Sequence, residues 1–133
     1  MQTIPGVGPV TAFALTAELG NLKKYTRQEL SAMSGLAPRL RESGTSVKSS
    51  RISKRGPVCV RKLMFMCTNH SIRKIPYLND MYTRLTLGGK AKLQAKCACM
   101  RMLLLIIRSV VVHERPYSEE FSYQTVAKQS QTA

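Results

Sequence analysis

The chain has 133 residues, enough for one domain of ordinary size with a buried core. Its 21 lysines and arginines outweigh 7 aspartates and glutamates, which gives a formal net charge of +14. This excess favours a polyanionic partner, and nucleic acid is the first candidate. An acidic membrane is the alternative, but the longest apolar run, residues 100–112, contains Arg101 and Arg108 and is shorter than the roughly 20 residues that span a bilayer. We therefore expect no membrane partner.

The start of the chain indicates the cellular compartment, and the spacing of its cysteines indicates whether it holds a metal. No charged and apolar leader precedes the predicted domain, so we expect a cytoplasmic protein with reduced thiols. Only Cys97 and Cys99 lie close in sequence, and two residues apart on a helix they point about 200° from each other. Since no second Cys or His pair complements them, buried thiols are favoured over a zinc site, and we expect no cofactor in this chain.

The first half of the chain predicts two helices and an irregular segment. Residues 4–9 read as a turn with Pro9 at the first helical position, and Gly20 has the place of a C-cap, which predicts a helix over 9–19. Thr26 and Glu29 have the spacing of a capping box, which starts a helix over 27–34. Residues 37–54 lose helical periodicity and gather Ser, Gly and Thr, which predicts two short extended pieces around a polar loop.

Three further helices are predicted in the second half. Gly56-Pro57 starts one that ends near Lys74, Pro76 opens one that ends near Leu87, and Gly88-Gly89 precedes a long final helix. Apolar residues of the final helix alternate at spacings of four and three, as in a coiled coil: Leu93, Cys97, Met100, Leu104, Ile107 and Val111. Because residues 102–112 are apolar nearly all round, a core helix packed on the first and third helices is favoured over a dimer seam.

The predicted fold class is mainly α, with a helix-hairpin-helix-like start, a short β or loop segment around residues 37–54, and then three further helices. From Tyr117 onward Ser, Gln and Thr dominate. We therefore expect a domain over residues 1–116 and a flexible polar tail over 117–133.

Two segments carry candidate nucleic-acid contacts. Gly6 and Gly8 match the hairpin of a helix-hairpin-helix, in which backbone N–H groups meet a phosphate at a helix N-terminus; a tight turn without a ligand is the alternative. Residues 39–62 hold eight basic residues against one acid, interleaved with hydroxyls, which favours phosphate binding over a solvated basic face. The candidate contacts there are Arg39, Arg41, Thr45, Ser46, Lys48, Arg51, Ser53, Lys54, Arg55, Arg61 and Lys62.

The same segment offers serines as candidate nucleophiles. A serine that attacks a phosphodiester needs a base for its proton, and cations or a metal for the charge that develops. The cations are present, but His70 and His113 fall in predicted helices and no acidic cluster is seen. Composition alone therefore leaves Ser43 as one loop serine among several.

Five motifs occur in an order and spacing that resemble the C-terminal domain of insertion-sequence-110 family transposases. This family consists of DEDD-type, bridge-RNA-guided recombinases related to Piv invertases. The resemblance covers roughly residues 2–116. The motifs are I-P-G-V-G-P-V-T-A (4–12), A-E-L-G (17–20), S-G-L-A-P-R (34–39), E-S-G-T-S-V (42–47) and R-I-S-K-R-G (51–56).

The resemblance implies a mechanism and partners. It places the nucleophile of a covalent phosphoserine link to DNA at Ser43, with Ser46 and Ser53 as weaker alternatives. It implies that a RuvC-like domain with four acidic residues and Mg²⁺ completes the site, that a structured guide RNA takes part, and that the domain assembles with copies of itself or with full-length transposase.

The RuvC-like domain normally precedes the 4–12 motif, so we expect this chain to hold the C-terminal domain only and to be inactive in cleavage by itself. The alternative function is a non-catalytic nucleic-acid module, either a remnant or a regulator of the full transposase.

Overall fold

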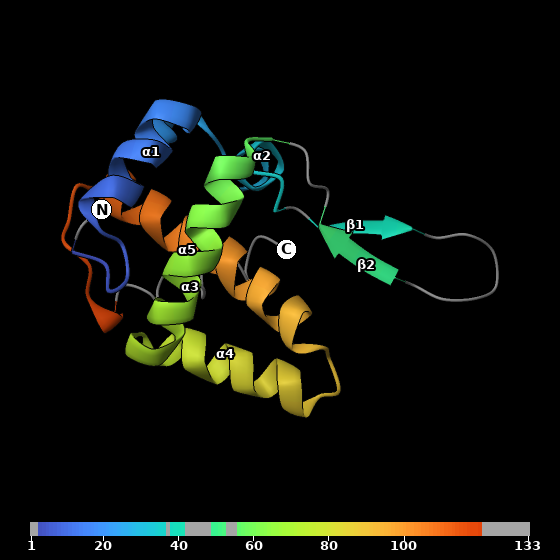
Figure 1. Ribbon diagram of the computed structural model, residues 1–133. Helices are drawn as coiled ribbons and strands as arrows, with labels where there is room; N and C mark the ends of the chain where they lie inside the picture. The colour runs from blue at the N-terminus through green and yellow to red at the C-terminus, as the bar shows by residue number, and fades with distance from the viewer. Residues whose placement is uncertain (1–2, 37, 42–48, 53–55, 121–133) are drawn as a thin grey trace.

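The structure is mainly helical, as predicted (Figure 1). It is a computed structural model that describes residues 3–36, 38–41, 49–52 and 56–120, with the two strands described by their backbone course. The elements in chain order are α1 (Pro9–Leu19), η1 (Leu22–Lys24), α2 (Arg27–Met33), β1 (Pro38–Arg41), β2 (Ser49–Ile52), α3 (Val58–Lys74), α4 (Pro76–Leu87) and α5 (Lys92–His113).

Local signals in the sequence set most helix ends. Pro9 and Pro76 occupy the first positions of α1 and α4, as predicted. The capping box of α2 is also confirmed, because the Glu29 backbone N–H donates to Thr26 Oγ1 over 3.2 Å and the Thr26 N–H donates to the Glu29 carboxylate over 2.7 Å. The short 3-10 helix η1 was not predicted; the Asn21 side chain caps it by accepting from the backbone N–H of Lys23.

Helix α5 forms the centre of the core. Leu103, Leu104, Ile106 and Ile107 are all fully buried, so the helix is covered on every side in this stretch. This confirms a core helix rather than a narrow seam, and Leu93 at its start is 63% exposed. Its main neighbours are α3 and α4, with η1 and α2 beside them. The predicted packing on the first helix is indirect, because α1 lies mainly against α3.

Polar contacts tie the end of α5 to the N-terminal third of the chain. Arg108 Nε donates to the carbonyl oxygen of Tyr25 over 2.8 Å, and burial, reinforced by the charge of Arg27, lowers the Arg108 pKa. Beyond α5, the backbone N–H of Tyr117 donates to Thr3 Oγ1 over 3.0 Å, and the Tyr117 side chain packs against the core. Ordered contacts thus reach residue 117, and residues 121–133 of the predicted tail lie outside the described part of the chain.

No helix in the described residues is long and apolar enough to cross a membrane.

The titration of Cys99 offers a test of the α4–α5 packing. Its Sγ lies 3.8 Å from the carbonyl oxygen of Leu78 in α4, and burial raises its pKa from 9.0 to about 11. The neutral thiol therefore contributes stability that is fully present below pH 9.0 and is lost as the pH rises through about 11. Between pH 8 and 11, the free energy of unfolding should fall by about 2 kcal/mol more for the unmodified chain than for Cys99→Ala. Urea unfolding of both proteins measures this difference, and identical pH dependence would contradict the burial of this thiol.

Candidate nucleic-acid interface

Strands β1 and β2 form an antiparallel hairpin that holds three of the predicted cationic contacts. Arg39 pairs with Arg51, and Arg41 pairs with Ser49. Because successive residues of a strand alternate between faces, positions 39, 41, 49 and 51 share one face of the hairpin. The two predicted extended pieces are thus present, and their register brings the three arginine positions together.

The other predicted residues of this segment fall between or just after the strands in sequence. They lie outside the described residues, and they are Ser43, Thr45, Ser46, Lys48, Ser53, Lys54 and Arg55.

Gly56 fixes the root of the hairpin against α2. Its φ is +112°, and a Cβ placed on it would lie 2.2 Å from the carbonyl oxygen of Met33, the last residue of α2. Met33 precedes β1 by five residues and Gly56 follows β2 by four, so the segments that flank the hairpin in sequence meet at the end of α2. Only a residue without a side chain permits this approach.

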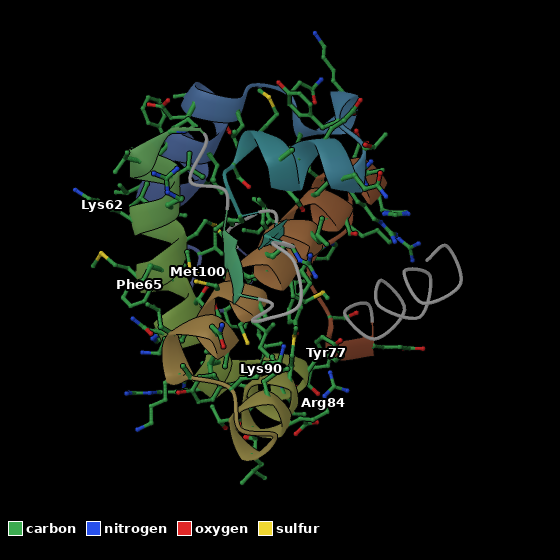
Figure 2. All side chains as sticks on the ribbon, turned by 90° about the vertical axis from the view of Figure 1, so that its right-hand side faces the viewer. Lys62, Phe65, Tyr77, Arg84, Lys90 and Met100 are labelled. Atoms are coloured by element: carbon green, nitrogen blue, oxygen red, sulfur yellow. The ribbon has the colours of Figure 1, made fainter. Side chains whose placement is uncertain are left out.

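Arg61 holds the same root from α3. This half-buried residue lies in the first turns of α3, and its guanidinium donates to the carbonyl oxygen of Gly56 over 3.0 Å. The sequence predicted Arg61 as a nucleic-acid contact, whereas the structure gives one of its donors a bond within the protein. Lys62, the next residue, is exposed and extends outward from α3 (Figure 2).

Gly6 has a packing role in the N-terminal turn. Its φ is +93°, and an added Cβ would lie 2.3 Å from Ser71 Oγ and 2.9 Å from the carbonyl oxygen of Cys67. Ser71 Oγ in turn donates to the carbonyl oxygen of Pro5 over 2.6 Å. The absence of a side chain at Gly6 is therefore explained by close contact with α3, without a phosphate.

Gly8 differs from Gly6 because it faces open space. It is the N-cap of α1, no side chain caps that helix end, and an added Cβ would meet nothing within 4 Å. Both glycines are half-buried, but of the two predicted phosphate contacts in this turn only Gly8 has free space where a side chain would be. The described residues contain the turn and the helix that follows it, so only that half of a helix-hairpin-helix is observed.

The N-terminal turn and the described strands of the hairpin are not brought together. Figure 1 shows the N-terminal turn and the β1–β2 hairpin on opposite sides of α3. Gly8 and the arginine positions of the hairpin therefore belong to separate surfaces.

The described residues do not fit the Mg²⁺ site that the resemblance implies for the complete enzyme. Within the described ranges, no three His, Cys, Asp or Glu side chains gather as a metal ion needs. Carboxylate oxygens are the ligands that Mg²⁺ prefers, and such a site would have to come from other residues.

Replacing Gly56 by alanine tests the root of the hairpin. We expect Gly56→Ala to lower the free energy of unfolding by about 2–4 kcal/mol, because an unfavourable backbone angle and overlap with the Met33 carbonyl add together. Gly20→Ala is the matched control, since Gly20 also has a positive φ, +70°, but no atom lies within 4 Å of the added Cβ. Gly20 has ψ −139°, outside the left-handed helical region, so the control should cost about 1–3 kcal/mol from backbone strain alone, without the part that overlap adds at Gly56. If denaturant unfolding shows that both variants lose the same free energy of unfolding, Gly56 does not lie in close contact with the end of α2.

The sequence singled out Gly56 only as the start of a helix and did not single out Ser71. The R-I-S-K-R-G motif that ends at Gly56 was a usable signal for a conformationally special glycine. Nothing local signals Ser71, because its partners lie 66 residues away in sequence.

Known proteins are similar to the part of the chain that contains the N-terminal turn and the hairpin. Residues 1–83 match the family described as Transposase IS116/IS110/IS902 family. The chain is 33% identical over 122 residues to the pilin gene-inverting protein of Moraxella bovis, which covers 90% of this chain and 38% of that protein. It is 36% identical over 78 residues to the transposase of insertion sequence element IS1328 from Yersinia enterocolitica, covering 58% of this chain and 23% of that protein. It is 37% identical over 81 residues to the transposase of insertion sequence element IS1111A from Coxiella burnetii, covering 60% of this chain and 22% of that protein. The chain thus spans less than two fifths of the length of these relatives.

Proposed function

The chain belongs to the IS116/IS110/IS902 transposase family, which implies a role in DNA recombination, and we propose that it is the DNA-binding, serine-bearing domain of such a recombinase. The observation that carries this proposal is the extent of the family match. Residues 1–83 include the N-terminal turn, the hairpin with its root, and every predicted contact residue. In this proposal residues 1–116 form the domain and residues 117–133 are its tail.

The chemistry proposed for Ser43 is transfer of a DNA strand to the protein. The Ser43 oxygen attacks the phosphorus of a phosphodiester, a bond forms between them, and the bond from phosphorus to one deoxyribose oxygen breaks. The serine proton leaves to a base, and the departing sugar oxygen takes up a proton. Cations of residues 39–55 offset the negative charge that builds on the phosphate oxygens. The hairpin supports this role because Ser43 falls between its two strands in sequence.

The base and the metal come from outside the described residues in this proposal. A RuvC-like acidic domain with Mg²⁺ supplies them, and a structured guide RNA and further copies of the protein complete the assembly. Without that domain the chain binds DNA and does not cleave it.

The experiment that tests the proposal is covalent capture. The chain is incubated with labelled element-end DNA, the guide RNA, Mg²⁺ and a separately produced RuvC-like domain, and the products are separated on a denaturing gel. The proposal predicts a labelled strand that migrates with the protein and is released by protease. DNA binding without a protein-linked strand would reject the serine mechanism.

The second candidate is a non-catalytic nucleic-acid module that competes with full-length transposase. It predicts that adding the chain to an active relative lowers recombination in proportion to its occupancy of DNA, whether residue 43 is Ser or Ala.

A further inference from the structure

The hairpin of β1 and β2 projects from the helical body. Figure 1 shows it extending from the end of α2, and Figure 2 views the molecule from the side on which it projects. In the described residues each strand pairs with the other, and neither makes an extensive contact with a helix. A two-stranded hairpin on its own is at best marginally stable in water. An element of this kind commonly gains its packing from a partner.

The register concentrates positive charge on one face of the hairpin. Arg39 and Arg51 are directly paired across the strands, and Arg41 occupies the same face two residues further along. Like charges at directly opposed positions destabilise a pair of strands. The register places three arginine positions on one face, and charge complementarity therefore favours an anionic partner for this face.

Gly56, which follows the hairpin in sequence, contacts two helices. Gly56 lies against the Met33 carbonyl, and Arg61 donates to the Gly56 carbonyl. These contacts join the segment that follows the hairpin in sequence to the end of α2 and the start of α3.

The dimensions favour one anionic surface among the nucleic acids. Paired strands lie about 4.8 Å apart. The major groove of B-form DNA is about 12 Å wide and admits a two-stranded hairpin, whereas the minor groove is about 6 Å wide. The major groove of double-stranded RNA is deep and narrow and excludes it.

We infer that the β1–β2 hairpin inserts into the major groove of duplex DNA, with the face that holds positions 39, 41 and 51 toward the DNA. The inference rests on the proposed function and adds to it the form of DNA, the groove, and the element that enters it. Gly56 and Arg61 then act as positioning residues for that element.

The test measures duplex DNA binding by fluorescence anisotropy for the full chain, Arg39→Glu and Lys74→Glu. Glu at position 39 creates an opposite-charge pair with Arg51, so the hairpin should not lose stability, yet binding should weaken by about 10-fold or more. Lys74→Glu changes the net charge equally at the exposed far end of α3 and should weaken binding by less than about 3-fold. Thermal unfolding of each variant checks that the domain remains folded.

Two further measurements identify the groove. Methyl green, which occupies the major groove, should displace the chain, whereas netropsin, which occupies the minor groove, should not. Binding of Arg39→Glu like the unmodified chain, equal losses in both charge variants, or displacement by netropsin alone would overturn the inference. In each of these cases the unmodified chain still binds DNA and the proposed function stands, whereas failure of the unmodified chain to bind duplex DNA would overturn both.

Discussion

Replacement of Ser43 by alanine is expected to eliminate the protein-linked DNA strand. Alanine has no oxygen to attack phosphorus, so the yield of linked strand should fall by at least about 1,000-fold. The affinity for DNA should stay within about twofold, because one neutral hydroxyl contributes little beside many charge contacts. Covalent capture on a denaturing gel and anisotropy on the same preparations measure the two quantities.

The other loop serines are the controls for this result. Ser46→Ala and Ser53→Ala remove a hydroxyl from the same basic segment and should leave the linked strand within a few-fold of its original yield. Loss of product in Ser46→Ala with product retained in Ser43→Ala would reassign the nucleophile.

Replacement of Gly6 by alanine is expected to destabilise the domain by about 2–5 kcal/mol. The added methyl group would overlap Ser71 Oγ at 2.3 Å and the Cys67 carbonyl at 2.9 Å, and the backbone angle of +93° is unfavourable for alanine. Relief of the overlap would also break the hydrogen bond from Ser71 to Pro5. A loss of this size is a large share of the stability of a small domain, and denaturant unfolding measures it.

Gly8→Asp separates packing from phosphate binding in the same turn. An added Cβ meets no atom within 4 Å, and aspartate is a favoured N-cap, so stability should be kept or should rise by up to about 1 kcal/mol. If a DNA phosphate lies at the start of α1, the added charge should weaken DNA binding by about 5-fold or more. Unchanged DNA affinity in the folded variant would remove this helix end from the interface.

Sequence reasoning was most successful where local chemistry determines structure. Pro9, Pro76 and the Thr26–Glu29 capping box placed helix starts correctly, because a missing N–H or a side-chain cap acts within one turn. The burial of α5 followed from a stretch that is apolar on all sides. These features need no knowledge of the rest of the chain.

The contacts that shape the candidate interface depend on distant residues. Gly6 against Ser71, and Gly56 against Met33, are approaches between segments whose proximity only the tertiary fold determines. The pairing of Arg39 with Arg51 likewise depends on register, which the polar segment between the strands did not specify. The hydrogen bond from the Arg61 guanidinium to the Gly56 carbonyl is a further contact that the sequence did not indicate, and the prediction of Arg61 as a nucleic-acid contact stays a prediction.

The measurement that tests the central claim most directly is the salt dependence of duplex DNA binding by the full chain. If the chain holds DNA through phosphate contacts from several of its cations, the logarithm of the association constant should fall linearly with the logarithm of salt concentration. Between four and seven contacts would give a slope of about −4 to −6. Absence of binding at low salt, or an affinity that does not change with salt, would contradict the assignment of this chain as the DNA-binding domain of a transposase.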